Sequence, residues 1–227
     1  MDTCKYIMTF MPYPIFNHPS SPRNGQNIGI LDLIWGLRDC YGLSYPLAIL
    51  LSVGSFILLR RISPICLEHV GKHDAIEHNA SLVHADCPSN QKYAPIRVVP
   101  ALLDAFIKEG RSDEKGPDAG ADKENDLLEI TDVAKFRIGR EKECGVVDGV
   151  HAEIARGEVA IAFGMWGQNI GGRTGIPRKW LRDWFENDRL PYGWRPSHTQ
   201  GLVDTMRRSS QIRKLMDQMR SQRQGTP

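Results

Sequence analysis

Apolar residues recur at three- and four-residue steps along most of the chain, which is the spacing of one face of an α-helix. This pattern, with the Pro and Gly residues that interrupt it, predicts a series of helices at residues 28–41, 46–59, 67–70, 72–86, 101–109, 132–143 and 151–165. Nothing in the pattern indicates strands, internal repeats or a linker between two cores. We therefore predict an all-α fold, a single-domain helical bundle.

Three stretches depart from the amphipathic pattern. Residues 110–125 are rich in Gly, Asp and Lys with almost no apolar side chain, which predicts a mobile surface loop. Residues 201–227 are polar and basic, and we expect a solvated tail or a frayed helix there. Leu43–Leu59 is nearly long enough to span a membrane, but Pro and Ser residues dilute it. We expect a buried core helix and no stable membrane span.

The bulk composition narrows the function only by exclusion. The 227 residues carry a formal net charge of +2, which gives no electrostatic basis for binding nucleic acid. The five cysteines form no CxxC pair, which argues against a zinc site or a dense disulfide framework. Met1–Phe16 do not form a convincing signal peptide, which favours an intracellular protein but leaves secretion open.

Lys72–Asp86 is the stretch with the most candidate chemistry. In a helix, Glu77 and Ser81 would lie one turn apart and could hold a hard cation such as Mg²⁺. A histidine beside a carboxylate could also transfer protons. Two other interpretations stay open. One is a solvated polar helix with scattered histidines. The other is a metal-dependent hydrolase that uses His73, Glu77 and His84, although the chain lacks an HExxH arrangement.

Glu158 is the second candidate for chemistry. It lies on the apolar stripe of the helix predicted at 151–165. A carboxylate in apolar surroundings has a raised pKa, which suits a general acid–base near neutral pH. The alternative is that Glu158 lies at the border of the stripe and reaches water. His151 and Glu153 are expected to be surface residues away from the face that carries Glu158.

Four segments together indicate a known family. Residues 77–82 are similar to a Glu-His-Asp-x-Ser-Leu signature, and residues 155–160 are similar to a Gly-Glu-x-Ala segment. Residues 17–25 and 176–196 are similar to an N-terminal segment with Pro-Arg-Asn-Gly and to a C-terminal segment with Trp and Arg-Leu-Pro. In this order they resemble the fungal heme-thiolate peroxidases, the family of the chloroperoxidases and unspecific peroxygenases.

This resemblance implies an oxidoreductase that uses heme b and hydrogen peroxide. In the family, the Glu matching Glu158 moves a proton between the peroxide oxygens, and the signature His, matching His78, assists it. The Glu and Ser of the signature, with the His carbonyl, bind Mg²⁺ or Mn²⁺ beside a heme propionate, which would place that ion at Glu77, His78 and Ser81. Ile161 and Phe163 could line the pocket. The expected reaction is the oxidation or halogenation of a small organic molecule, in a setting such as fungal secondary metabolism.

The resemblance sets the expected domain limits, which are an uncertain segment at 1–16, a heme haloperoxidase-like domain at 17–200 and a polar basic tail at 201–227. It also exposes a departure at the heme-iron ligand. The position in register with the family's Cys is Thr9, and the nearest cysteine is Cys4. A hydroxyl is a poor iron ligand, whereas a thiolate favours O–O cleavage.

Three explanations compete for the missing ligand. The first is a mispredicted exon at the start of the sequence, which is favoured because the match is good from Asn17 onward. The second is that Cys4 reaches the iron through a rearranged loop. The third is loss of heme chemistry, which leaves a heme-free helical domain that binds a small molecule or a protein. A smaller departure is Asn79, which stands where the family has Asp. An amide that accepts a hydrogen bond from His78 would give that histidine a lower pKa than an Asp would.

Overall fold

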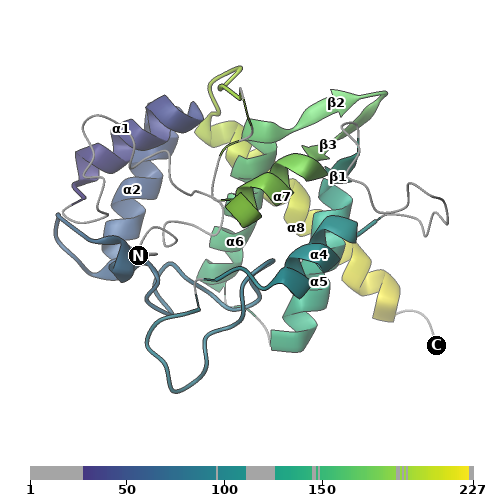
Figure 1. Cartoon of the computed structure of the whole chain (residues 1–227), viewed down its shortest axis with the longest axis horizontal. Coiled ribbons are helices and arrows are strands. Elements are labelled where there is room, and N and C mark those ends of the chain that lie inside the picture. The colour runs from purple at the N-terminus through teal and green to yellow at the C-terminus, as the bar shows by residue number, and fades with distance from the viewer. Residues whose placement is uncertain are drawn as a thin grey trace.

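A computed structural model of the chain describes residues 28–95, 97–110, 126–144, 147, 149–187, 190, 192 and 194–224. Figure 1 shows that its helices gather around one central helix, α6. The expectations for 1–16, including Cys4 and Thr9, lie outside the described residues. The loop predicted at 110–125 also lies outside the described residues, except for residue 110.

The structure is mostly helical and forms one domain, as the hydrophobic pattern predicts. Most of the predicted helices are present with their ends shifted by one or two residues. Their bounds are α1 Ile30–Tyr41, α2 Tyr45–Leu59, α3 Leu67–Val70, α4 Pro100–Lys108, α5 Ile130–Cys144, α6 Gly149–Trp166, α7 Arg178–Asn187 and α8 Leu202–Gln224.

A small antiparallel sheet is present that the pattern did not predict. Its strands are β1 (Leu127–Glu129), β2 (Gln168–Ile170) and β3 (Arg173–Pro177), in the order β1-β3-β2. Gly171 and Gly172 form the turn between β2 and β3 with φ of 60° and 82°. A two-residue hairpin turn with positive φ at both positions favours glycine. The strands have three to five residues, which is too short for an alternating pattern to stand out.

α6 is the central element. Eleven of its 18 residues are buried, and it packs against α8 and β3. A surface helix would bury one stripe only, so the extent of this burial shows that α6 has neighbours on several sides. Glu158 is one of its buried residues, at 6% exposure. The fold thus places a carboxylate in the middle of the molecule.

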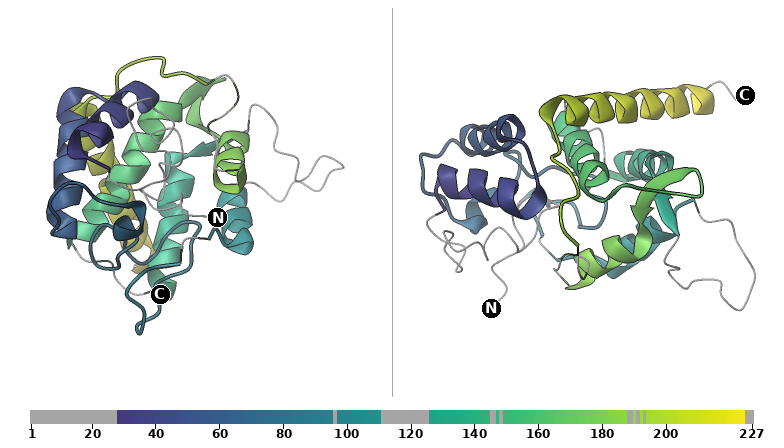
Figure 2. Two further views of the ribbon diagram at one scale, coloured as in Figure 1. Left: turned by 60° about the vertical axis from the view of Figure 1, so that its left-hand side comes forward. Right: turned by 90° about the horizontal axis from the view of Figure 1, so that it is seen from above.

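The segment predicted to be a solvated tail is instead an integral helix. α8 runs alongside α6 and α5, and Figure 2 shows it as a long rod beside α6. Ile212 and Met216 on α8 are fully buried, and Arg208 donates a hydrogen bond to the Ala160 carbonyl of α6 (2.9 Å). The polar composition misled the prediction because the apolar contacts come from a few residues spaced along one face.

Gln200 joins the C-terminal part of the chain to the first two helices. Its backbone N–H donates to the Gly42 carbonyl (2.8 Å), and its carbonyl accepts from Ser44 (2.9 Å). Its side-chain amide donates to Thr205 Oγ1 (2.7 Å). Gly164 of α6 leaves room for this side chain, because a Cβ at Gly164 would lie 2.1 Å from Gln200 Oε1.

α2 is buried along one face only. Its buried residues include Ser52, Phe56 and Leu59, whereas Ile49 and Ile57 are exposed. The expectation of a buried core helix is therefore only half correct. Within the described residues, no helix is both long and apolar enough to cross a membrane.

Candidate functional site

The stretch 72–86, expected to be a helix, folds as turns and isolated bridges. His73 and Glu77 form one such bridge. Asp74 and Ala80 adopt left-handed backbone conformations, with φ of 58° and 62°, which interrupt any helix. The one-turn relation assumed for Glu77 and Ser81 therefore does not exist.

Arg140 of α5 fastens this loop to the helical core. It is buried, and its Nε donates to the Ser81 carbonyl (3.0 Å) while its Nη2 donates to Asp86 (3.2 Å). Asp86 in turn accepts from the Ala80 N–H (2.6 Å). A planar guanidinium that bridges two acceptors fixes both distance and direction. Sequence reasoning missed Arg140 because its partners lie more than fifty residues away.

The fastened loop brings His78 against Glu158 on α6. His78 Nε2 lies 3.8 Å from Glu158 Oε2, and both side chains are almost wholly buried. His78 Nδ1 lies 2.7 Å from the Asn79 carbonyl. Because a carbonyl only accepts, Nδ1 carries a proton and Nε2 is the nitrogen that faces Glu158. The separation of Nε2 and Oε2 is longer than a hydrogen bond, and such contacts tighten when a ligand binds.

The pKa of His78 reports this pairing. Burial lowers the pKa, since the charged form loses water, but the neighbouring Glu158 carboxylate raises it by more and the net shift is upward. Arg137, also buried, lowers the pKa of His78 by its charge. The site therefore favours the protonated form of His78.

The Asn79 side chain does not take the role assigned to it from the sequence. The backbone carbonyl of Asn79, not its amide, accepts the bond from His78 Nδ1. The amide oxygen Oδ1 is buried and has no hydrogen-bond partner among the residues that the structure describes. An Asp at this position would change the charge near His78 without replacing the acceptor that orients it.

The proposed cation ligands are engaged elsewhere. The Glu77 carboxylate accepts from His73 Nδ1 (3.1 Å), and Ser81 Oγ lies 3.3 Å from His84 Nδ1. Burial raises the pKa of Glu77, and this outweighs the bond from His73. Across the described ranges, no group of three or more His, Cys, Asp or Glu is placed to hold a metal ion. The arrangement gives no support for Mg²⁺ or Mn²⁺.

His151 belongs to the site, contrary to the expectation that it faces away. It precedes Glu158 by seven residues, which is two helical turns and therefore the same face of α6. Its ring centroid lies 6.5 Å from that of His78, and its Nε2 lies 3.3 Å from the Ala75 carbonyl. The seven-residue spacing was the signal that could have identified it. Glu153 is exposed, as expected.

An apolar cavity of about 640 Å³ lies beside Glu158, between α2, α6 and α8. Its walls are mainly aliphatic, and its size is typical of sites for organic molecules. Ile161, expected in the pocket, lines it, whereas Phe163 packs in the core. The lining contains Glu158 and four residues that are close in sequence to Glu158 or to His78, namely Ile76, Ile154, Gly157 and Ile161.

The cysteines that the structure describes do not supply a thiolate at this cavity. None of Cys40, Cys66, Cys87 and Cys144 lines it. Burial raises the pKa of the Cys40 and Cys87 thiols and brings that of Cys144 to about 11. These thiols are therefore protonated at neutral pH.

Comparison with known proteins identifies one family. A sequence model of the family described as "Peroxidase, family 2" matches residues 15–199, which is most of the chain. No curated protein matches the sequence. The matched range contains the loop with His78, the helix with Glu158 and the lining of the cavity on α2 and α6.

Proposed function

Because the chain belongs to peroxidase family 2, we propose that it is a heme enzyme that uses a hydroperoxide to oxidise or halogenate a small organic molecule. One observation carries the proposal. The Glu158 carboxylate is buried at the wall of an apolar cavity, with His78 Nε2 3.8 Å away. A carboxylate beside a histidine, shielded from water, is the arrangement that general acid–base chemistry requires.

A bound heme would supply redox-active iron, with the peroxide as the oxidant. Glu158 accepts the proton from one peroxide oxygen and returns it to the other, which leaves as water. His78 would keep a positive charge 3.8 Å from the Glu158 carboxylate, because that carboxylate raises the pKa of the imidazole. The Asn79 carbonyl keeps the imidazole in the orientation that directs Nε2 at Glu158.

The described residues fit a heme on the side of the acid–base pair. Ile76 and Ile161 would provide apolar contacts next to Glu158, and an aliphatic wall excludes water from the reacting atoms. A protein ligand to the iron would come from outside the described residues, where Cys4 is the one cysteine and Thr9 stands in the family's register. No described thiol competes for that role at the cavity.

The test is to add hemin to the purified protein and record the spectrum of the reduced form with carbon monoxide. Stoichiometric heme binding with a thiolate-type band would support the proposal. Absence of heme binding by the folded protein would contradict it and favour the alternative, a heme-free binding protein of the same fold.

The variant Thr9→Cys tests whether the pocket is competent once the missing iron ligand is supplied. If the parent binds hemin weakly and Thr9→Cys gains a thiolate-type spectrum with peroxide-dependent oxidation, the pocket is competent. If the variant remains helical by circular dichroism but gains neither property, the proposed register is wrong.

A further inference from the structure

Exposed hydrophobic side chains are concentrated on one part of the molecule. Twelve large hydrophobic residues are exposed among the described residues, and ten of them lie on α1, α2, the link after α2 or the first turns of α8. Scattered apolar residues need no explanation, but a contiguous group indicates an interaction surface. We call this group the apolar face. It comprises Leu31, Trp35, Tyr45, Ile49, Leu50, Val53, Ile57, Ile62, Val203 and Met206.

A stripe along α2 forms the centre of the apolar face. Ile49, Val53 and Ile57 are spaced four residues apart and are 45%, 37% and 68% exposed. Residues four apart lie one above the other on a helix, so these side chains form one continuous row. Tyr45–Leu59 contains no charged residue. α2 therefore presents a purely apolar row to its surroundings.

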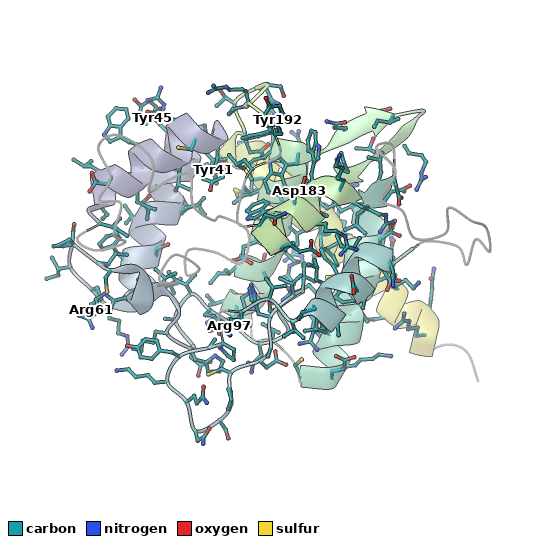
Figure 3. All side chains as sticks on the ribbon, in the orientation of Figure 1. Tyr41, Tyr45, Arg61, Arg97, Asp183 and Tyr192 are labelled. Carbon is teal, nitrogen blue, oxygen red and sulfur yellow. The ribbon has the colours of Figure 1, made fainter. Side chains whose placement is uncertain are left out.

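Aromatic and basic residues stand at the two ends of this row. At one end, Trp35 and Tyr45 pack edge to face, with ring centroids 5.9 Å apart. The Arg38 guanidinium lies 4.2 Å from the Tyr45 ring centroid. At the other end, Arg60 and Arg61 are exposed. Figure 3 shows Tyr45 and Arg61 at the upper and lower ends of the same side of the molecule.

The mouth of the cavity opens on the apolar face. Leu50 on α2 and Met206 on α8 both line the cavity, and they are 54% and 63% exposed. On α8, Arg207 and Arg213 are exposed, and each forms an ion pair, Arg207 with Asp204 (3.2 Å) and Arg213 with Glu153 (3.3 Å). An apolar centre thus surrounds the entrance to the space beside Glu158, and Arg60 and Arg61 stand at one end of the apolar face.

We propose that the apolar face docks on the surface of a bilayer that contains anionic lipids, with α2 lying in the plane of the surface and the cavity mouth facing the lipid. Apolar side chains enter the boundary of the acyl chains, while Trp, Tyr and Arg remain at the headgroups. Basic residues add electrostatic attraction to anionic headgroups. Docking of this kind requires no helix that spans the bilayer.

A second copy of the chain fits the same face less well. Symmetric pairing of two α2 rows in antiparallel orientation would bring Arg60 and Arg61 of one copy against Arg38 of the other. Parallel pairing would bring the two Arg60–Arg61 pairs together. Either arrangement places like charges side by side, whereas anionic lipid neutralises them.

Docking also indicates a substrate class, a conclusion that rests on the proposed function as well. Molecules dissolved in the lipid would reach Glu158 through Leu50 and Met206 without crossing water. Lipid-soluble molecules are the class that this route selects. Lipid binding can be measured on protein without heme, so its failure is distinguishable from failure of the peroxidase proposal.

The test is sedimentation of the full chain with vesicles of phosphatidylcholine alone or of phosphatidylcholine with phosphatidylserine. We expect binding to the anionic vesicles, weaker binding to the neutral ones, and weakening by salt. Arg61→Gln should lower the partition coefficient about fivefold, since one basic residue near an anionic surface is lost. Binding to neither kind of vesicle would overturn the proposal.

Two matched variants test the location of the contact. Ile57→Glu should lower binding about tenfold, because it places a carboxylate at the boundary of the acyl chains. Val150→Glu makes the same change of charge at an exposed residue of α6 outside the apolar face, and it should lower binding far less. Equal losses in the two variants would show a charge effect without a defined face and would refute the assignment.

The fluorescence of Trp35 provides an independent test of contact with the lipid. Vesicles with brominated acyl chains should quench the fluorescence of the parent protein, and Trp35→Phe should lose most of this quenching. Sedimentation equilibrium without lipid should show a monomer. A dimer that Ile57→Glu dissociates would assign the apolar face to a second copy and overturn the docking proposal.

Discussion

At the scale of single residues, two acidic side chains near the candidate site differ in burial and in partner, since the Glu158 side chain is 6% exposed and that of Glu77 is 19% exposed. Glu158 faces a histidine whose other nitrogen is held by the backbone. Glu77 receives a bond from His73 in a loop. Burial disfavours charge on the Glu77 carboxylate and outweighs the bond from His73, whereas the Glu158 carboxylate raises the pKa of His78. The variants Glu158→Gln and Glu77→Gln separate these effects.

Replacing Glu158 by Gln should lower the pKa of His78. The carboxylate that raises this pKa is removed, while burial and Arg137, which lower it, remain. We expect the pKa to fall below the ordinary value of about 6.5. NMR titration of the imidazole measures it directly. Because the native pKa of His78 is raised, wild-type stability should decline as pH rises above 6.5, and the variant should lack that decline. An unchanged His78 titration would show that Glu158 does not act on it.

Glu77→Gln should stabilise the protein at neutral pH. The pKa of Glu77 is raised by burial in the folded state, so stability falls as pH rises from 4.5 through the native pKa. Glutamine is neutral, so the variant should not lose stability as pH rises, and its amide oxygen can still accept the hydrogen bond from His73. Urea unfolding at pH 7 should show the variant as the more stable protein, with the difference vanishing below pH 4.5. A variant that is less stable at pH 7 would mean that the charge of Glu77 is stabilised by a partner.

At the scale of elements, α6 positions Glu158 and is itself fixed by close packing. The side chain of Gln200 fills the space beside Gly164 and ties α6 to the connection between α1 and α2. The approach leaves no space for a methyl group. A glycine within a helix normally weakens it, so Gly164 is explained by packing and not by helix propensity.

Gly164→Ala should therefore destabilise the protein, whereas Gly139→Ala in α5 should stabilise it. A Cβ at Gly164 would clash with Gln200, and such overpacking costs about 1–3 kcal/mol. A Cβ at Gly139 meets no atom within 4 Å, and replacing Gly by Ala within a helix contributes about 1 kcal/mol. Urea unfolding of both variants gives the two free energies. Stabilisation by Gly164→Ala would show that Gln200 can move aside.

The periodic pattern predicted the helices because the apolar face that each helix buries is formed by residues within that helix. It failed where distant residues decide the conformation. Residues 72–86 are rich in helix-compatible residues, but Arg140 holds Ser81 and Asp86 in an extended loop. The family resemblance singles out Glu158 and His78, and their catalytic roles stay predictions. Their 3.8 Å approach and the contact with His151 depend on how loop and helix meet, which no local pattern encodes.

At the scale of the whole molecule, α8 closes the structure. It covers α6 and α5 and forms one wall of the cavity. Its composition is polar, yet Thr205, Ile212 and Met216 are buried. The helix therefore contributes to stability through a small number of apolar contacts, and its removal would open the space beside Glu158.

Met216→Ala should lower the free energy of unfolding by about 2–4 kcal/mol, since it leaves a cavity at a fully buried position. Met206→Ala is the matched control on the same helix. Its side chain is 63% exposed, and the change should stay within about 0.5 kcal/mol. Thermal or urea unfolding measures both. Equal, small effects would mean that α8 is not packed on the core.

The central claim is that Glu158 transfers the proton in peroxide-dependent oxidation. The most direct measurement is the peroxide-dependent rate per bound heme for the wild type, Glu158→Gln and Glu186→Gln. The last variant changes an exposed carboxylate of α7. Loss of a general acid–base should lower kcat/KM of Glu158→Gln about 10²–10⁴-fold, with heme binding intact and Glu186→Gln near the wild type. A Glu158→Gln variant that turns over at the wild-type rate with the same heme content would contradict the claim.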